Sequence, residues 1–165
     1  MPHMKKITFL FLLFCMTGIC GKNIWAQAGK LPPFQIVQSN NSIFRAQQLP
    51  LGKPVVIVYF DTDCDHCHEL MKTMMANIKK LQKASVAMVT YLPVEKVAKF
   101  ARQYDIQKFS NIYMGTEGTT FFLKNYYKLS AMPFMALYTK NGDLVKTYPR
   151  ENSLTELLTT LNALP

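Results

Sequence analysis

Residues 55–60 read VVIVYF, a continuous run of β-branched and aromatic side chains. Such a run is typical of a strand that is buried on both faces of a sheet. Residues 66–83 then carry apolar side chains at helical spacing. The pattern predicts a central strand followed at once by a helix, with Cys64 and Cys67 at the point where the helix begins.

The rest of the chain alternates in the same way, which indicates the α/β class. Further strands are expected at 34–37, 86–91, 112–114, 134–139 and 144–148, and a loop at 115–118. Further helices are expected from Pro93, over 119–128 and from Ser153. Asn141 and Gly142 predict a tight turn that pairs the last two strands antiparallel. Ser153 and Glu156 predict a capping box at the start of the last helix.

The first 28 residues have the composition of a secretory signal. Lys5 and Lys6 precede an apolar run over 7–20, and small residues at Ala26 and Ala28 suit cleavage. The run is shorter than the roughly 20 residues that span a bilayer. We therefore expect a signal peptide over 1–28, a single domain over 29–165, and a location in the periplasm or cell envelope. Lipidation at Cys20 and an uncleaved membrane tether remain as alternatives.

Charge does not indicate a nucleic-acid-binding protein. The formal net charge of the chain is +9, and it falls to +6 without the signal, which carries three lysines and no acids. The remaining lysines are scattered singly or in pairs, a pattern typical of solvated helix faces rather than of a phosphate-binding patch.

The cysteines indicate redox chemistry. Cys15 and Cys20 leave with the signal, so the mature chain keeps only Cys64 and Cys67, at C-x-x-C spacing. A disulfide that closes so short a loop stabilises a fold little. Chemistry is therefore the better explanation for this pair.

The start of a helix is a suitable place for a reactive cysteine. A cysteine attacks as the thiolate, and the unpaired N–H groups and dipole of a helix N-terminus favour negative charge. Cys64 would gain most from this position, and Cys67, one turn later, could close the disulfide. His66 could further stabilise the Cys64 thiolate, whereas Asp65 would act against it. Glu69 is either a proton acceptor near the pair or a first-turn residue that favours the helix N-terminus.

Together these features resemble the thioredoxin superfamily: a C-x-x-C that opens a helix after a buried strand, an x-Pro far downstream, and an Asn-Gly hairpin. The resemblance covers about residues 34–162 and is closest to exported TlpA/ResA-like thiol–disulfide oxidoreductases. It implies a three-layer fold, with a central mixed sheet, flanking helices, and a C-terminal β-hairpin and helix. It also implies that Cys64 is the exposed nucleophile and Cys67 the buried resolving thiol. Met132 and Pro133 would form a cis-proline site that supports the substrate backbone.

The chain departs from the thioredoxin pattern at three positions. Asp63 replaces the usual tryptophan before the first cysteine, Val58 stands where thioredoxin carries a buried carboxylate, and Met132 replaces the common threonine before the proline. The proton relay and the substrate preference therefore do not follow from the resemblance.

Two other functions fit part of the motif. With His68, the sequence satisfies the C-x-x-C-H attachment motif of c-type haem, although such proteins are mostly helical. His68 would otherwise be an exposed helix residue. A copper- or zinc-binding chaperone of the same fold is the second alternative, but its ligands would all be local. The peroxidase pattern of the family is not met.

The function that we expect is disulfide exchange with exported proteins through the C-D-H-C motif, with reduction of clients favoured over oxidation. The partners would be exported protein thiols and disulfides, together with a membrane or periplasmic redox partner. The mechanism requires no cofactor and no metal, and we expect a monomer.

Overall fold

The computed structural model describes residues 29–150 and 153–165 of the chain. The expected signal peptide over 1–28 lies outside these residues, and so does any cleavage or lipidation within it. In the part that the structure describes, no helix has the length and apolar character needed to cross a membrane.

A seven-stranded mixed sheet forms the centre of the domain, in the order β2-β1-β5-β4-β3-β6-β7. Its strands are β1 (Gln35–Gln38), β2 (Ile43–Arg45), β3 (Val55–Tyr59), β4 (Ser85–Thr90), β5 (Ile112–Thr116), β6 (Phe134–Tyr138) and β7 (Leu144–Pro149). Strands β3, β4 and β5 are parallel, and the pairs β3–β6, β6–β7, β1–β5 and β1–β2 are antiparallel. The predicted central mixed sheet with a C-terminal hairpin is confirmed.

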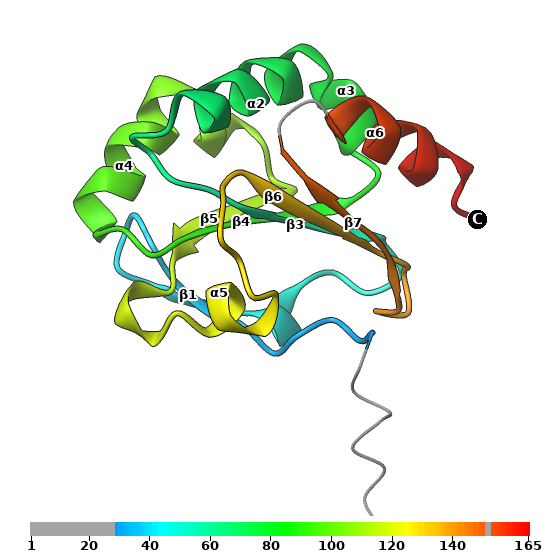
Figure 1. The fold of residues 1–165 in the computed structure, drawn as a ribbon, viewed down its shortest axis with the longest axis horizontal. Coiled ribbons are helices and arrows are strands. Elements are labelled where there is room, and N and C mark those ends of the chain that lie inside the picture. Colours follow the sequence, from blue (N-terminus) through cyan, green and yellow to red (C-terminus); the bar gives the residue numbers. More distant parts are fainter. Residues whose placement is uncertain (1–28, 151–152) are drawn as a thin grey trace, which may run out of the picture.

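Helices cover both faces of this sheet (Figure 1). The α-helices are α2 (Asp65–Ala76), α3 (Ile78–Leu81), α4 (Val94–Gln103), α5 (Phe122–Tyr126) and α6 (Leu154–Ala163). Short 3-10 helices are η2 (Ala46–Gln48), η3 (Ile106–Lys108) and η4 (Gly118–Thr120). Helices α2, α3, α4 and α6 lie on one face and α5 lies on the other, which gives the predicted three layers.

Strand β3 joins the two halves of the core. All five of its side chains are buried, and they alternate between the faces of the sheet. Val56 and Val58 belong to the core under the large helical layer, whereas Val55, Ile57 and Tyr59 belong to the core on the α5 side. The strand is therefore anchored on both sides just before the cysteines.

The helix predicted over 66–83 is interrupted, and this expectation is corrected. Asn77, with φ −110° and ψ 18°, separates α2 from α3. Its side-chain amide donates to the carbonyl oxygen of Thr73 at 3.0 Å. An asparagine side chain that bonds the backbone in this way competes with the regular helical pattern.

The prediction was wrong for two strands that pair with β1. Strand β2 was missed, and β5 is longer than the expected 112–114, so that Gly115 lies within a strand and not in a loop. A Cβ at Gly115 would lie 2.7 Å from the carbonyl oxygen of Val37. Glycine therefore allows β5 to approach β1 closely enough to pair.

The third helix is also shorter than the predicted 119–128. Phe121 adopts a left-handed conformation, with φ 46°, and separates η4 from α5. The buried carboxylate of Glu117 accepts a hydrogen bond from the backbone N–H of Leu123 at 2.7 Å. This carboxylate satisfies an N–H group that the start of a helix leaves unpaired.

The capping box predicted at Ser153 is wrong. The Ser153 hydroxyl donates to the carbonyl oxygen of Pro149 at 2.8 Å and makes no cap hydrogen bond. Glu156 instead pairs with Lys146 on the neighbouring strand β7. The predicted hairpin does form, and Gly142 supplies the positive φ of 76° in its turn.

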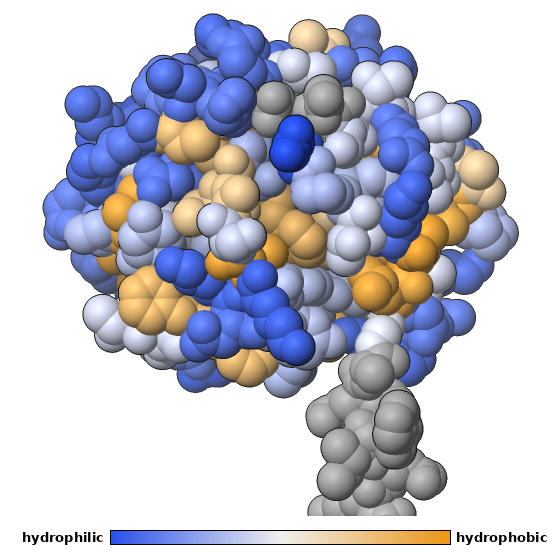
Figure 2. Space-filling view, viewed as in Figure 1, coloured by the Kyte–Doolittle hydropathy of each residue, from blue (hydrophilic) through white to orange (hydrophobic). Residues whose placement is uncertain are grey.

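The surface that faces the viewer in Figure 2 is mixed in character. Hydrophilic residues dominate over the helical layer, and hydrophobic residues reach this face in separate patches.

Candidate active site

Cys64 lies at the N-terminus of α2, as predicted. The strand β3 ends at Tyr59, and the loop that follows delivers Cys64 as the N-cap residue, with φ −100° and ψ 122°. Its carbonyl oxygen accepts hydrogen bonds from the N–H groups of Cys67 at 3.0 Å and His68 at 3.1 Å. The Cys64 side chain is half-buried, so it remains accessible from solvent at the positive end of the helix dipole.

Cys67 faces the core. It is 1% exposed, and burial raises the pKa of its thiol well above the usual range. The backbone N–H of Asp61 donates to its sulfur at 3.4 Å, which acts in the opposite direction. Both cysteines are free, so the structure represents the dithiol. One accessible and one buried sulfur is the division of roles that the resemblance implies.

A second segment, far along the chain, meets Cys64. The Met132–Pro133 peptide bond is cis, and the Cys64 thiol faces the carbonyl oxygen of Met132 at 3.8 Å. Pro133 immediately precedes β6, the neighbour of β3 in the sheet. Adjacent strands therefore bring the predicted substrate-binding residues to the cysteine.

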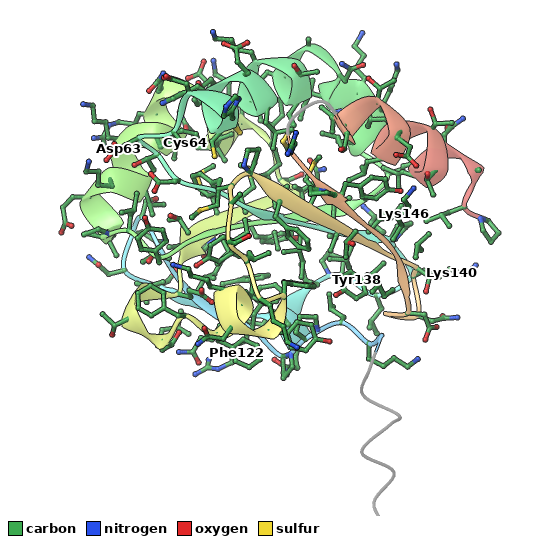
Figure 3. The ribbon with its side chains drawn as sticks, in the orientation of Figure 1. Asp63, Cys64, Phe122, Tyr138, Lys140 and Lys146 are labelled. Carbon is green, nitrogen blue, oxygen red and sulfur yellow. The ribbon has the colours of Figure 1, made fainter. Side chains whose placement is uncertain are left out.

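Acidic side chains surround the start of the helix, and most of them point to solvent. Figure 3 shows Asp63 beside Cys64, where the loop enters α2. Asp63 pairs with Lys96 of α4 at 2.5 Å, which holds the pKa of this carboxyl below its usual range. Asp65 is exposed in the first turn of the helix, and so is His66.

Glu69 also lies on the exposed side of α2. It pairs with Lys72 at 2.6 Å, and this contact lowers the pKa of the Glu69 carboxyl. Glu69 is the fifth residue of α2, and Asp65 is the acidic residue of the first turn, so the predicted first-turn position of Glu69 is not confirmed. Asp61, which the sequence analysis did not single out, is the acidic residue whose backbone N–H contacts the Cys67 sulfur, and its charge raises the pKa of that thiol.

His68 differs from the exposed helix residue that was expected. It is half-buried and packs against Phe100 of α4, with ring centroids 5.3 Å apart. Its Nε2 lies 3.0 Å from the carbonyl oxygen of Thr62, and its Nδ1 lies 2.6 Å from the hydroxyl of Tyr104. A carbonyl only accepts, so Nε2 carries the proton and Nδ1 accepts from Tyr104. The two ring nitrogens therefore have different partners, Nε2 in the loop before Cys64 and Nδ1 at the C-terminal end of α4.

The Tyr104→Phe variant tests this contact. It removes the hydroxyl that His68 accepts from, and should lower the free energy of unfolding by about 0.5–1.5 kcal/mol. Urea denaturation measures the change. Tyr126→Phe is the matched control, since Tyr126 is 39% exposed and its hydroxyl donates to the carbonyl oxygen of Lys30 at 3.1 Å. The control should change stability by less than about 0.5 kcal/mol. Equal losses in the two variants would contradict a structural role for the His68 contact.

The described residues offer no group of three or more histidine, cysteine, aspartate or glutamate side chains arranged to hold a metal ion. His66 and His68 both belong to the first turn of α2, as the sequence indicated.

Comparisons with known proteins agree with this fold. A thiol-disulfide oxidoreductase from Bacteroides fragilis is similar in structure, with a TM-score of 0.65, 12% identity, and coverage of 80% of this chain and 98% of that chain. Peroxidoxin BcpB from Mycobacterium tuberculosis has a TM-score of 0.67 and 16% identity over 83% of this chain and 97% of its own. Arabidopsis thaliana ScoI, solved with copper bound, has a TM-score of 0.60 and 17% identity over 79% of this chain and 96% of its own.

At such low identities these structures show the fold alone. No curated protein matches the chain. The family model for the thioredoxin-like domain matches residues 45–164, which include β3, both cysteines, Pro133 and the C-terminal hairpin and helix. The chain therefore belongs to the thioredoxin-like domain family.

Proposed function

We propose that this chain is an exported thiol–disulfide oxidoreductase of the TlpA/ResA-like type, which exchanges disulfides with other exported proteins. One observation carries the proposal: the accessible Cys64 sulfur lies at a helix N-terminus, facing the carbonyl oxygen of Met132 at 3.8 Å, while Cys67 is buried one turn behind it. A nucleophile, a resolving thiol and a backbone acceptor thus meet at one place.

The proposed reaction has two steps. The Cys64 thiolate attacks a client disulfide, which forms a mixed disulfide and releases one client sulfur as a thiolate that takes up a proton. The Cys67 thiolate then attacks the Cys64 sulfur and releases the second client sulfur. Two electrons pass from the cysteine pair to the client, and a separate redox partner must reduce the pair again.

Met132 and Pro133 would support the client during the first step. The Met132 carbonyl oxygen lies beside Cys64, so a client backbone that lies along this segment would bring its disulfide to the attacking sulfur. A contact of this kind uses the backbone and tolerates many client sequences.

Carboxylates near the pair favour reduction of clients over oxidation. A neighbouring negative charge disfavours a thiolate, and a reduced form that is less stabilised gives up its electrons more readily. Asp65 lies directly after Cys64, and the charge of Asp61 contributes to the raised pKa of Cys67. His66 would act in the opposite direction.

The reduction potential tests both the activity and its direction. Equilibration of the chain with glutathione should give a value nearer to thioredoxin, at about −270 mV, than to DsbA, at about −120 mV. Intact-mass measurement of the alkylated chain reads out the fraction of dithiol. A Cys64→Ser, Cys67→Ser double variant is the control and should not reduce insulin disulfides. Full activity in this double variant would overturn the proposed function.

The cellular part of the proposal has its own measurement. The amino-terminal 28 residues, with Lys5, Lys6 and the apolar run over 7–20, support export, and periplasmic or envelope clients follow from it. Fractionation of cells that express the full chain should recover it outside the cytoplasm. Recovery in the cytoplasm alone would contradict export and leave the thiol chemistry to be judged by the potential.

A further inference from the structure

The buried thiol of Cys67 must lose its proton before it can act. It is 1% exposed, and its burial disfavours the thiolate. In the thioredoxin pattern a buried carboxylate stands at the position of Val58, which cannot accept a proton. This chain therefore needs another acceptor near Cys67.

Asp61 is the acidic residue that contacts Cys67. It follows β3 by two residues, and its backbone N–H donates to the Cys67 sulfur at 3.4 Å. The side chain is half-buried, and its charge is close enough to raise the pKa of Cys67. Backbone and carboxylate of one residue thus act on the same thiol.

Two hydrogen bonds hold the Asp61 carboxylate. Its Oδ1 accepts from the backbone N–H of Asp63 at 2.8 Å, and its Oδ2 accepts from the hydroxyl of Tyr91 at 2.7 Å. Tyr91 follows β4, the parallel neighbour of β3, so the ends of two adjacent strands build the contact. The hydrogen bond to Asp61 raises the pKa of Tyr91, which therefore stays a protonated donor. The Lys124 ammonium lies 5.3 Å from the centre of the Tyr91 ring.

The other titratable groups nearby are engaged elsewhere or exposed. Lys96 holds Asp63, and Lys72 holds Glu69. The imidazole of His68 is bonded at both nitrogens, and Asp65 and His66 are exposed in the first turn of the helix.

We propose that Asp61 is the base that accepts the Cys67 proton and that Tyr91 positions its carboxylate. The proposal rests on the proposed function. In the mixed disulfide, the proton passes from the Cys67 sulfur to a carboxylate oxygen of Asp61, directly or through one water molecule. The resulting thiolate forms a bond to the Cys64 sulfur, the bond from Cys64 to the client sulfur breaks, and the client thiolate leaves. The proton on Asp61 then returns to the departing thiolate or to solvent.

Dithionitrobenzoate, which contains a disulfide, separates the two steps. It is added to the reduced full chain, with Cys15 and Cys20 replaced by serine so that only the pair reacts. Release of the first thionitrobenzoate reports the attack by Cys64, and release of the second reports the attack by Cys67. Absorbance at 412 nm follows both phases.

The Asp61→Asn variant distinguishes two possible roles of the carboxylate, because these roles predict opposite changes in the rate of the second phase. Asparagine keeps the backbone N–H and a side-chain oxygen for the Asp63 contact. If Asp61 is the base, the second phase should slow by at least about tenfold at pH 7 and the first by less than about twofold. The difference in second-phase rate between the variant and the wild type should narrow near pH 10, where hydroxide can deprotonate Cys67 without help from a side chain. If Asp61 were only a neighbouring negative charge, its removal would make the thiolate easier to form and the second phase faster.

Control variants keep the test decisive. Asp63→Asn removes the same charge from the neighbouring residue and should leave the second phase unchanged. Tyr91→Phe keeps the ring and should slow the second phase by less than Asp61→Asn does. If circular dichroism shows that Asp61→Asn does not fold, Tyr91→Phe replaces it in the test. A second phase as fast as wild type in both Asp61→Asn and Tyr91→Phe would overturn the assignment of Asp61. Absence of a second phase in the wild-type chain would instead overturn the proposed function.

Discussion

A chain in which serine replaces Cys67 should accumulate a mixed disulfide through Cys64, with a lifetime at least about 100-fold longer than in the wild type. The reason is that a serine hydroxyl does not attack a disulfide, so the second step is lost while the first remains. Cys67 is 1% exposed, and its sulfur accepts a hydrogen bond from the backbone N–H of Asp61. Serine is nearly the same size as cysteine and fits the same place. Intact mass spectrometry and non-reducing gels of the chain purified from cells measure the adducts.

The matched control is Cys64→Ser, which should form no adduct because the accessible nucleophile is gone. It leaves Cys67 in place, 1% exposed in the core. Adducts that form equally in both variants would show that the two thiols are interchangeable. Rapid turnover by Cys67→Ser would show that a thiol of the client resolves the intermediate, and would contradict the role given to Cys67.

The largest expected loss of stability comes from Glu117→Ala. The Glu117 carboxylate is 7% exposed and accepts hydrogen bonds from the Tyr59 hydroxyl at 2.6 Å and from the N–H of Leu123 at 2.7 Å. Burial raises the pKa of Tyr59, which stays a protonated donor. Alanine would leave both donors buried without an acceptor, and we expect a loss of about 2–4 kcal/mol in the free energy of unfolding.

Urea denaturation with an unchanged m-value would measure this loss. Glu117→Gln keeps the size and one acceptor oxygen, so it should lose less than the alanine variant. Glu156→Ala removes an exposed partner of Lys146 and should cost less than about 1 kcal/mol. A loss below about 0.5 kcal/mol in Glu117→Ala would mean that the buried carboxylate does not tie α5 to β3.

The elements predicted well are those whose pattern is long and local. The run at 55–60 became β3, with every side chain buried, and the pattern at 86–91 became β4. The last helix, predicted from Ser153, begins at Leu154, and its side chains at Leu154, Leu157 and Leu161 are buried. In each case hydrophobic periodicity within one segment is enough, because the faces of the element are decided by that segment alone.

The errors lie where a side chain chooses between local and distant partners. Ser153 and Glu156 have the spacing of a capping box, yet the serine bonds Pro149 and the glutamate pairs with Lys146. Asn77 lies in a helical pattern, but its side chain bonds the carbonyl oxygen of Thr73 and interrupts the helix. Such competition depends on neighbours that spacing alone does not reveal.

The candidate site, too, was predicted in part and missed in part. The spacing of Cys64 and Cys67 after a buried strand predicted a thiol pair at the start of a helix, and the structure has this arrangement. The contacts of Asp61 with Tyr91 and of His68 with Tyr104 join residues 30 and 36 positions apart. No pattern in the sequence linked them.

The sequence by itself determined the class of fold, the central strand and the place of the two sulfurs, because these depend on the order of apolar residues and on the geometry of a helix start. Only the tertiary structure decided how deeply Cys67 is buried and which backbone N–H group donates to its sulfur. The parallel pairing of β3 with β4 brings Asp61 to Tyr91, and the packing of α2 buries Cys67 beneath the helical layer. Burial and proximity are properties of segments that meet in space, and they therefore arise only when the sheet has formed.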